Sequence, residues 1–163
     1  DIDVREDVAL MMLSNTLKEV AMTYGVFIQS ATQLNDNWSR IETGLRDQNC
    51  IRGSKAIVDK VDIGMIATRL NEKEKDKIKE VYEGLRKSNP LKFDHEPNIV
   101  IDLYKNRRGE MSYVKIFRWF DHATCRAKDL FITDTSYKAV EIGELKYEKH
   151  VYKFEDLKAR GEL

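Results

Sequence analysis

Apolar residues at three- and four-residue spacing mark the first element of the chain. Between residues 8 and 24 they occur at Leu10, Leu13, Leu17, Val20, Ala21 and Tyr24. This spacing predicts a helix with one face on a core, and Gly25 is expected to end it. Residues 26–31 are β-branched and aromatic, which predicts a buried strand. A helix followed by a strand indicates an α/β layer.

Two further elements follow a polar stretch. Residues 32–60 lack an apolar period and are rich in Asn, Asp, Arg and Gly, so we expect long loops there. Residues 61–68 predict a second buried strand. Asn71 and Glu74 have the spacing of a capping box, and they introduce a helix over residues 72–88.

The second half of the chain reads mainly as strands. Residues 98–104 predict a third strand, and the alternation over residues 112–120 predicts its antiparallel return. Residues 105–110 then form a basic hairpin tip, with the bend at Arg108-Gly109. Edge strands are expected at 130–132 and 139–142, and a short helix at 154–160.

Composition and charge narrow the classes of function. The 163 residues fit one domain, and 28 basic residues balance 28 acidic ones, so no net field attracts nucleic acid or lipid. No apolar run approaches the roughly 20 residues of a membrane span, and two cysteines without metal-ligand spacing exclude a disulfide framework and a zinc site. We expect a cytoplasmic protein. Because the first residue is Asp rather than Met, we expect a segment of a longer chain.

Polar and basic residues at the ends of predicted elements are the candidates for chemistry. Gln33 follows the first strand, where an α/β sheet binds ligands, although a turn former also fits there. Backbone amides and cations of the next loop suit a phosphodiester chain, and a solvated loop is the alternative. These loop residues are Arg40, Arg46, Arg52, Gly53, Ser54 and Lys55.

The hairpin tip offers Lys105, Arg107 and Arg108 on two strands, a geometry suited to phosphate recognition in a neighbouring molecule. A charged tip also serves solubility alone. The sequence contains no hydrolase or metalloprotease motif and no Gly-x-x-x-x-Gly-Lys-Ser/Thr phosphate loop.

The order of these motifs resembles the C-terminal half of the RecA-like motor domain of DnaB-type, ring-forming replicative helicases, including phage primase-helicases. Residues 17–26 and Gln33-Leu34-Asn35 resemble the family's helix, strand and sensor. Residues 51–62 resemble its DNA-loop segment, with Lys55 at a family Gly. Lys105-Asn106-Arg107-Arg108-Gly109 resembles its Lys-x-Arg-x-Gly hairpin.

The resemblance covers residues 10–120 and implies a RecA-like P-loop fold with a mixed sheet whose Walker A and Walker B strands lie outside this chain. Residues 1–145 would be the motor part, with 72–88 as an inserted helix, and 146–163 a tail or short helix. It further implies ATP and Mg²⁺ as cofactors, held mainly by the missing half, and a hexameric ring that moves on single-stranded DNA. A primase or a helicase loader is a further expected partner.

The resemblance also implies roles for individual residues. Gln33 would sense the γ-phosphate, and Lys105 and Arg107 would reach the ATP of the adjacent subunit. The DNA backbone would be held by Arg40, Arg46, Arg52, Gly53, Ser54 and Lys55. The chain alone is expected to be inactive, because the phosphate loop is not in it. The alternative is a non-catalytic RecA-like module that binds single-stranded DNA or a partner.

Overall fold

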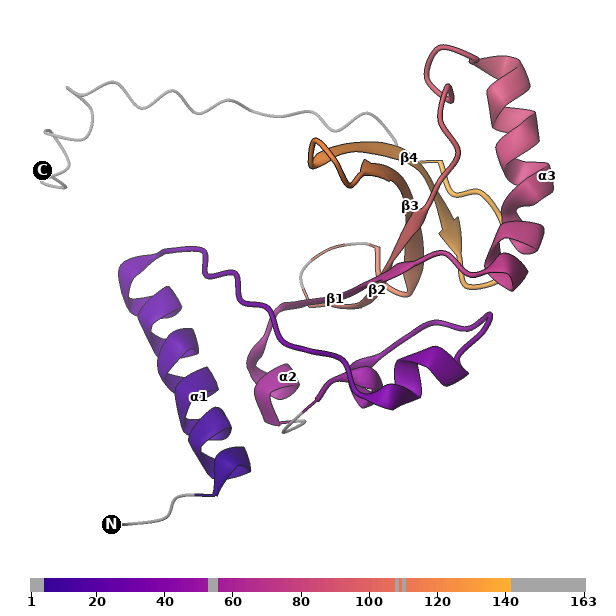
Figure 1. Cartoon of the computed structure of the whole chain (residues 1–163). Helices are drawn as coiled ribbons and strands as arrows, with labels where there is room; N and C mark the ends of the chain where they lie inside the picture. Colours follow the sequence, from indigo (N-terminus) through magenta and orange to yellow (C-terminus); the bar gives the residue numbers. More distant parts are fainter. Residues whose placement is uncertain (1–4, 53–55, 108, 110, 142–163) are drawn as a thin grey trace, which may run out of the picture.

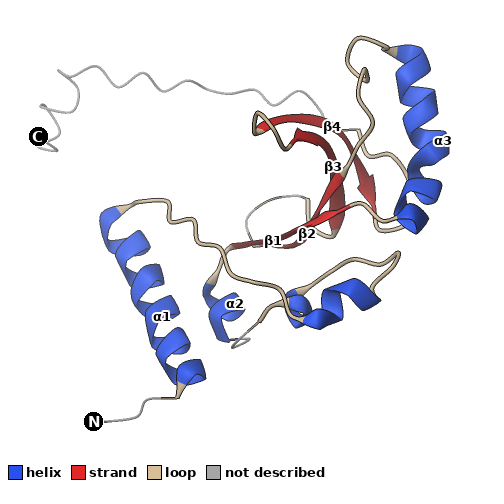
Figure 2. Cartoon of the chain, in the orientation of Figure 1, coloured by secondary structure: helices blue, strands red, loops and turns tan. Residues whose placement is uncertain are grey.

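The computed structural model describes residues 5–52, 56–107, 109 and 111–141 (Figure 1). Three α-helices, two short 3-10 helices and four strands make up this part of the chain (Figure 2). In chain order they are α1 (Glu6–Tyr24), η1 (Asp36–Arg40), η2 (Gln48–Cys50), α2 (Ala56–Lys60), β1 (Ile63–Arg69), α3 (Glu72–Ser88), β2 (Ile99–Asn106), β3 (Val114–Asp121) and β4 (Arg126–Asp134).

The four strands form one sheet in the order β1-β2-β3-β4, and every neighbouring pair is antiparallel. The chain is therefore of mixed α/β class, as expected. The expected mixture of parallel and antiparallel pairing is not found among the described strands. A consecutive antiparallel order needs only short connections or one helix, and α3 is the helix between β1 and β2.

The first predicted helix is confirmed as α1, which ends at Gly25 in the left-handed conformation with φ 61°. The strand predicted at residues 26–31 is wrong. This segment pairs with no described strand, and Phe27 is 82% exposed. Its apolar pattern favours a strand, but a strand also needs a neighbour for its backbone groups. The described residues provide none.

The predicted helix at residues 72–88 is confirmed as α3. Asn71 accepts a hydrogen bond from the Glu74 backbone N–H, and the Glu74 carboxylate accepts one from the Asn71 N–H. Ile78 and Tyr82 are buried in the main core. The helix was expected to be an insertion, and in this structure its inner face is an integral part of the core.

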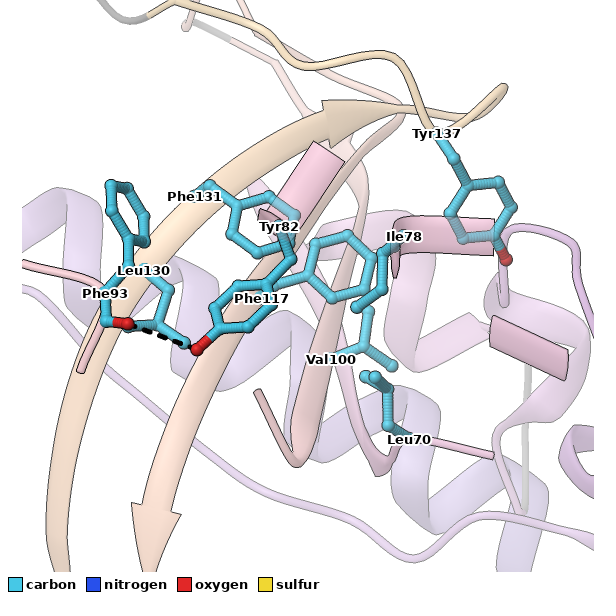
Figure 3. Close-up of a cluster of buried hydrophobic side chains, with 9 residues drawn as sticks. All are labelled: Leu70, Ile78, Tyr82, Phe93, Val100, Phe117, Leu130, Phe131 and Tyr137. Atoms are coloured by element: carbon cyan, nitrogen blue, oxygen red, sulfur yellow. Dashed lines mark hydrogen bonds between the residues drawn. The ribbon is translucent and has the colours of Figure 1, made fainter. Parts of the chain in front are cut away.

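The main core lies between α3 and the middle of the sheet (Figure 3). The rings of Phe117 and Phe131 stack at 4.8 Å between centroids. Tyr82 donates a hydrogen bond from its hydroxyl to the Phe93 carbonyl at 3.2 Å. Aromatic contacts between α3, β3 and β4 therefore hold this half of the molecule together.

A second, smaller core lies where α2 meets the sheet. It contains Cys50, Val58, Ile66 and Tyr104. Gly64 on β1 makes room for it, because an added Cβ would lie 2.4 Å from the Tyr104 ring. On its other side α2 packs against α1, at the opposite end of the molecule from α3 (Figure 1).

The other predicted strands are confirmed only in part. The strands expected at 61–68, 98–104 and 112–120 are confirmed as β1, β2 and β3. The strand expected at 130–132 is longer than expected. Of the strand expected at 139–142, the described residues 139–141 form only an isolated bridge between Ala139 and Thr133, and residue 142 lies outside the described residues. The helix at 154–160 and the tail at 146–163 lie outside the described residues.

Two further properties follow from the described part of the chain. Neither α1 nor any other described helix has the length and hydropathy of a membrane-spanning segment. Cys50, the last residue of η2, is fully buried, and burial raises the pKa of its thiol. Cys125 lies exposed in the turn between β3 and β4, with φ 56°.

Candidate functional site

Gln33 and Arg52 lie side by side. The Gln33 side-chain oxygen accepts a hydrogen bond from the Arg52 guanidinium at 3.2 Å, and the Arg52 backbone N–H donates to the Gln33 carbonyl at 2.9 Å. A bridge between Leu34 and Ile51 continues this pairing. Both Gln33 and Arg52 are exposed. The structure thus brings together two predicted site residues from different motifs.

Asn35 fixes this pairing. Its side-chain amide donates to the carbonyls of Asn49 at 2.8 Å and Ile51 at 3.1 Å, and its oxygen accepts from the Asn37 N–H. Its backbone N–H donates to the Cys50 carbonyl at 2.8 Å. Asn35 is the last residue of the Gln-Leu-Asn motif, yet sequence reasoning gave it no role of its own.

The predicted DNA-facing residues other than Arg52 divide into three groups. Arg40 is exposed and has no hydrogen-bond or ion-pair partner within the described part of the chain. Arg46 is only 1% exposed, so it is not available to a DNA strand, and this prediction is wrong. Gly53, Ser54 and Lys55 lie outside the described residues.

Arg46 belongs to a buried ionic network that the sequence did not reveal. Its guanidinium lies 3.0 Å from carboxylate oxygens of both Glu74 and Asp102. Lys115 completes the network, with its ammonium 2.6 Å from Asp102 and 3.4 Å from Glu74. Glu74, Asp102 and Lys115 are each 0% exposed. Two cations and two anions from four different segments therefore neutralise one another inside the protein.

Burial and the nearby charges of the network shift the pKa values of Arg46 and of the neighbouring Tyr137. Burial acts to lower the pKa of Arg46, but hydrogen bonds and charges from Glu74 and Asp102 outweigh it, and the pKa is raised. Tyr137 lies beside the network, with the Lys115 ammonium 5.4 Å from its ring centroid. Burial, followed by the charges of Glu74 and Asp102, raises the pKa of the Tyr137 hydroxyl far above its usual value. Arg46 therefore stays charged and the Tyr137 hydroxyl stays protonated at neutral pH.

The cations at the end of β2 contact their own chain. Lys105 donates to the carbonyls of Val58 at 2.6 Å and Asp59 at 3.4 Å, near the C-terminal end of α2. The Arg107 guanidinium also donates to the Asp59 carbonyl, at 2.6 Å, and its backbone N–H donates to Asp62. We expected Arg107 to point away from its own subunit. It is exposed, but it is already held by α2.

The Asn106 side chain forms hydrogen bonds within the turn that connects β2 to β3. Its side-chain oxygen accepts from the Gly109 N–H at 3.0 Å, and its amide donates to the Met111 carbonyl at 2.8 Å. A Cβ on Gly109 would lie 2.0 Å from the Asn106 amide nitrogen. A side chain at Gly109 would therefore displace the Asn106 amide from its two hydrogen bonds in the hairpin. Arg108 lies outside the described residues.

The exposed donors suit phosphate better than metal. No group of three or more His, Cys, Asp or Glu side chains in the described part of the chain is placed to hold a metal ion. Gln33 and Arg107 carry exposed donors that fit phosphate oxygens.

Comparisons with known proteins give one informative relationship. No known protein family matches the chain, and no solved structure matches it. The chain is similar to the SPbeta prophage-derived uncharacterized protein YorI of Bacillus subtilis (strain 168), at 37% identity over 147 residues. The match covers 88% of this chain and 28% of that protein. The chain thus spans little more than a quarter of the length of this relative.

Proposed function

We propose that this chain is part of the motor domain of a DnaB-type replicative helicase, which hydrolyses ATP and moves along single-stranded DNA as a ring. The observation that carries the proposal is the meeting of three motifs at α2. Gln33 contacts Arg52, which lies just before α2, and Lys105 and Arg107 bind the carbonyls near its C-terminal end. Leu34 and Ile51, the chain neighbours of Gln33 and Arg52, pack in the same small core as Val58 of α2. Motifs far apart in sequence that contact phosphates in such motors therefore share one core with this short helix.

Each residue has a role within this proposal. Bound ATP and Mg²⁺ supply the phosphoryl group and the charge neutralisation needed for its transfer. Gln33 donates a hydrogen bond from its side-chain amide to a γ-phosphate oxygen. Arg107 donates hydrogen bonds from its guanidinium to the ATP of an adjacent subunit. Arg40 and Arg52 bind DNA phosphates. The contact between Gln33 and Arg52 gives DNA and nucleotide a direct link.

The apolar surface of the N-terminal part supports the proposal that further strands complete a RecA-like sheet. Val26, Phe27 and Ile28 are exposed on a segment without a strand partner, and Ile63 and Met65 are exposed on β1, an edge strand. A large exposed apolar surface is typical of an interface. We propose that strands from the rest of a longer protein, including the phosphate loop, pair here.

The relative supports a phage context. Its name describes it as prophage-derived, and it is far longer than this chain. We propose a phage replication protein that acts in the bacterial cytoplasm. A primase domain or a helicase loader is the partner that we propose for it beyond the ring itself.

The experiment is an ATPase assay of the longer protein that contains this chain, with and without single-stranded DNA. We expect Arg107→Ala to lower turnover by on the order of 10³. Arg126→Ala, which removes an exposed arginine from the start of β4, is the matched control and should leave turnover unchanged. The isolated chain should hydrolyse nothing.

Three outcomes would contradict the proposal. Hydrolysis by the isolated chain would show that no outside phosphate loop is needed. Equal turnover of the two arginine variants would remove Arg107 from the mechanism. Binding of single-stranded DNA by the longer protein without any ATPase would favour the non-catalytic module instead.

A further inference from the structure

Lys105 and Arg107 differ in environment, although both were expected to reach a neighbour's nucleotide. The Lys105 ammonium is partly buried and donates to two carbonyls of α2, at 2.6 and 3.4 Å. Arg107 is exposed, and one of its terminal nitrogens binds one of those carbonyls. A guanidinium has five N–H donors, so Arg107 keeps donors for a phosphate. Lys105 has three, and two of them are directed at α2.

The surroundings of Lys105 make its position rigid. The preceding residue, Tyr104, is buried in the small core together with Val58, whose carbonyl accepts the shorter Lys105 hydrogen bond. The side chain is thus attached to β2 at one end and to a buried turn of α2 at the other. The last carbonyls of a helix also carry partial negative charge, which favours a cation.

We propose that Lys105 is a positioning residue that clamps the hairpin onto α2 and thereby places Arg107. This inference rests on the proposed function and assigns the two cations of the motif different tasks. Arg107 is the group that touches nucleotide, and Lys105 acts through it. Because α2 begins just after Arg52, the clamp also joins the candidate DNA segment to the finger.

The first experiment needs no enzymatic activity. In the isolated chain, amide hydrogen exchange is measured at Arg107, whose N–H donates to the Asp62 carbonyl at 2.9 Å. Lys105→Met should raise its exchange rate about tenfold, the scale of one charge-assisted hydrogen bond. Lys79→Met removes an exposed lysine of α3 that has no described partner, and should change nothing.

Lys105→Gln provides a second variant if Lys105→Met does not fold. Its shorter amide should also release the hairpin. Unchanged exchange at Arg107 in either folded variant would show that Lys105 does not hold the hairpin, and would overturn the inference whatever the protein does.

The second experiment is a double-mutant cycle on basal ATPase in the longer protein. If Lys105 acts through Arg107, the double variant Lys105→Met/Arg107→Met should be no slower than Arg107→Met alone. If Lys105 contacts nucleotide itself, or only stabilises the fold, its removal should slow both backgrounds by the same factor, and the inference fails. A wild-type protein without ATPase would instead refute the proposed function, while the exchange result still decides the role of the clamp.

Discussion

Helices α1 and α3 have similar lengths but opposite surfaces. α3 buries Glu74, Ile78 and Tyr82 and covers its outer faces with Lys and Glu. α1 packs a narrow side on α2 and exposes apolar residues elsewhere. These residues are Val8, Met11, Met12, Leu13, Val20, Met22 and Tyr24. So many exposed apolar side chains are typical of a surface that another element covers. The outer surface of α3 is therefore typical of a helix that faces solvent. The outer surface of α1 is typical of a helix that another layer covers.

The starts of the two helices differ in the same way. Asn71 and Glu74 close a capping box at the start of α3. Arg5, at the start of α1, makes no side-chain capping hydrogen bond. Side-chain capping hydrogen bonds therefore fix the start of α3, whereas the start of α1 has none.

The largest effect should come from breaking the attachment of α3 to the loop that precedes α2. Arg46→Met leaves the buried carboxylates of Glu74 and Asp102 with Lys115 alone. We expect a loss of about 3 to 5 kcal/mol in the free energy of unfolding of the chain, measured by denaturant titration. Arg40→Met should stay within about 0.5 kcal/mol. Similar losses in both variants would show that the network is not the main support.

The second effect compares the helices directly. Ile78→Ala in α3 removes a buried side chain and should cost about 2 to 5 kcal/mol. Met22→Ala in α1 removes a side chain that is 73% exposed, and should stay within about 0.5 kcal/mol. Urea titration of both variants of the isolated chain gives the measurement. A large loss for Met22→Ala would mean that the outer face of α1 is already covered in solution.

The same contrast explains what sequence could predict. Asn71, Glu74 and the apolar stripe behind them are local signals, and they identified α3 and its cap correctly. The period-two pattern likewise identified β3. Residues 26–31 carry an equally apolar pattern, but pairing depends on a second strand that their own sequence does not contain.

The candidate site shows the same limit. Arg40 and Arg46 are both arginines in a polar loop, and no local pattern distinguishes the exposed one from the buried one. Their difference arises from Glu74 and Asp102, which are 28 and 56 residues beyond Arg46. The Lys-x-Arg-x-Gly motif located the hairpin, whereas the carbonyls that bind Lys105 belong to α2 and were found only in three dimensions.

A smaller effect should follow from removing the cap of α3. Asn71→Ala loses the hydrogen bond to the Glu74 N–H, and we expect a cost of about 1 kcal/mol in unfolding free energy. Arg5→Ala, at the corresponding position of α1, should change the unfolding midpoint very little, because no cap is lost. The comparison of the two helix starts would be wrong if the two variants lost equal stability.

The smallest effect concerns a surface pair beyond α3. Hydrogen bonds from Lys128 and then His95 lower the pKa of Asp94 to about 2, from an ordinary value of 3.8. A depressed folded-state pKa stabilises the protein above about pH 4, and this contribution is lost as pH falls toward 2. Asp94→Asn should therefore slightly lower the unfolding midpoint at pH 6 and make no difference near pH 2. An effect of the same size at both pH values would exclude the ion pair as its cause.

The two cysteines provide a handle for physical measurement. Cys50 is fully buried with a raised thiol pKa, so a maleimide reagent should leave it untouched in the folded chain. Cys125 is exposed in the β3–β4 turn, at the opposite end of β3 from the Lys105 hairpin. The natural sequence thus accepts a single fluorophore at a defined point remote from the candidate site. Energy transfer between labelled copies can then test whether copies of the chain associate, without any engineered substitution.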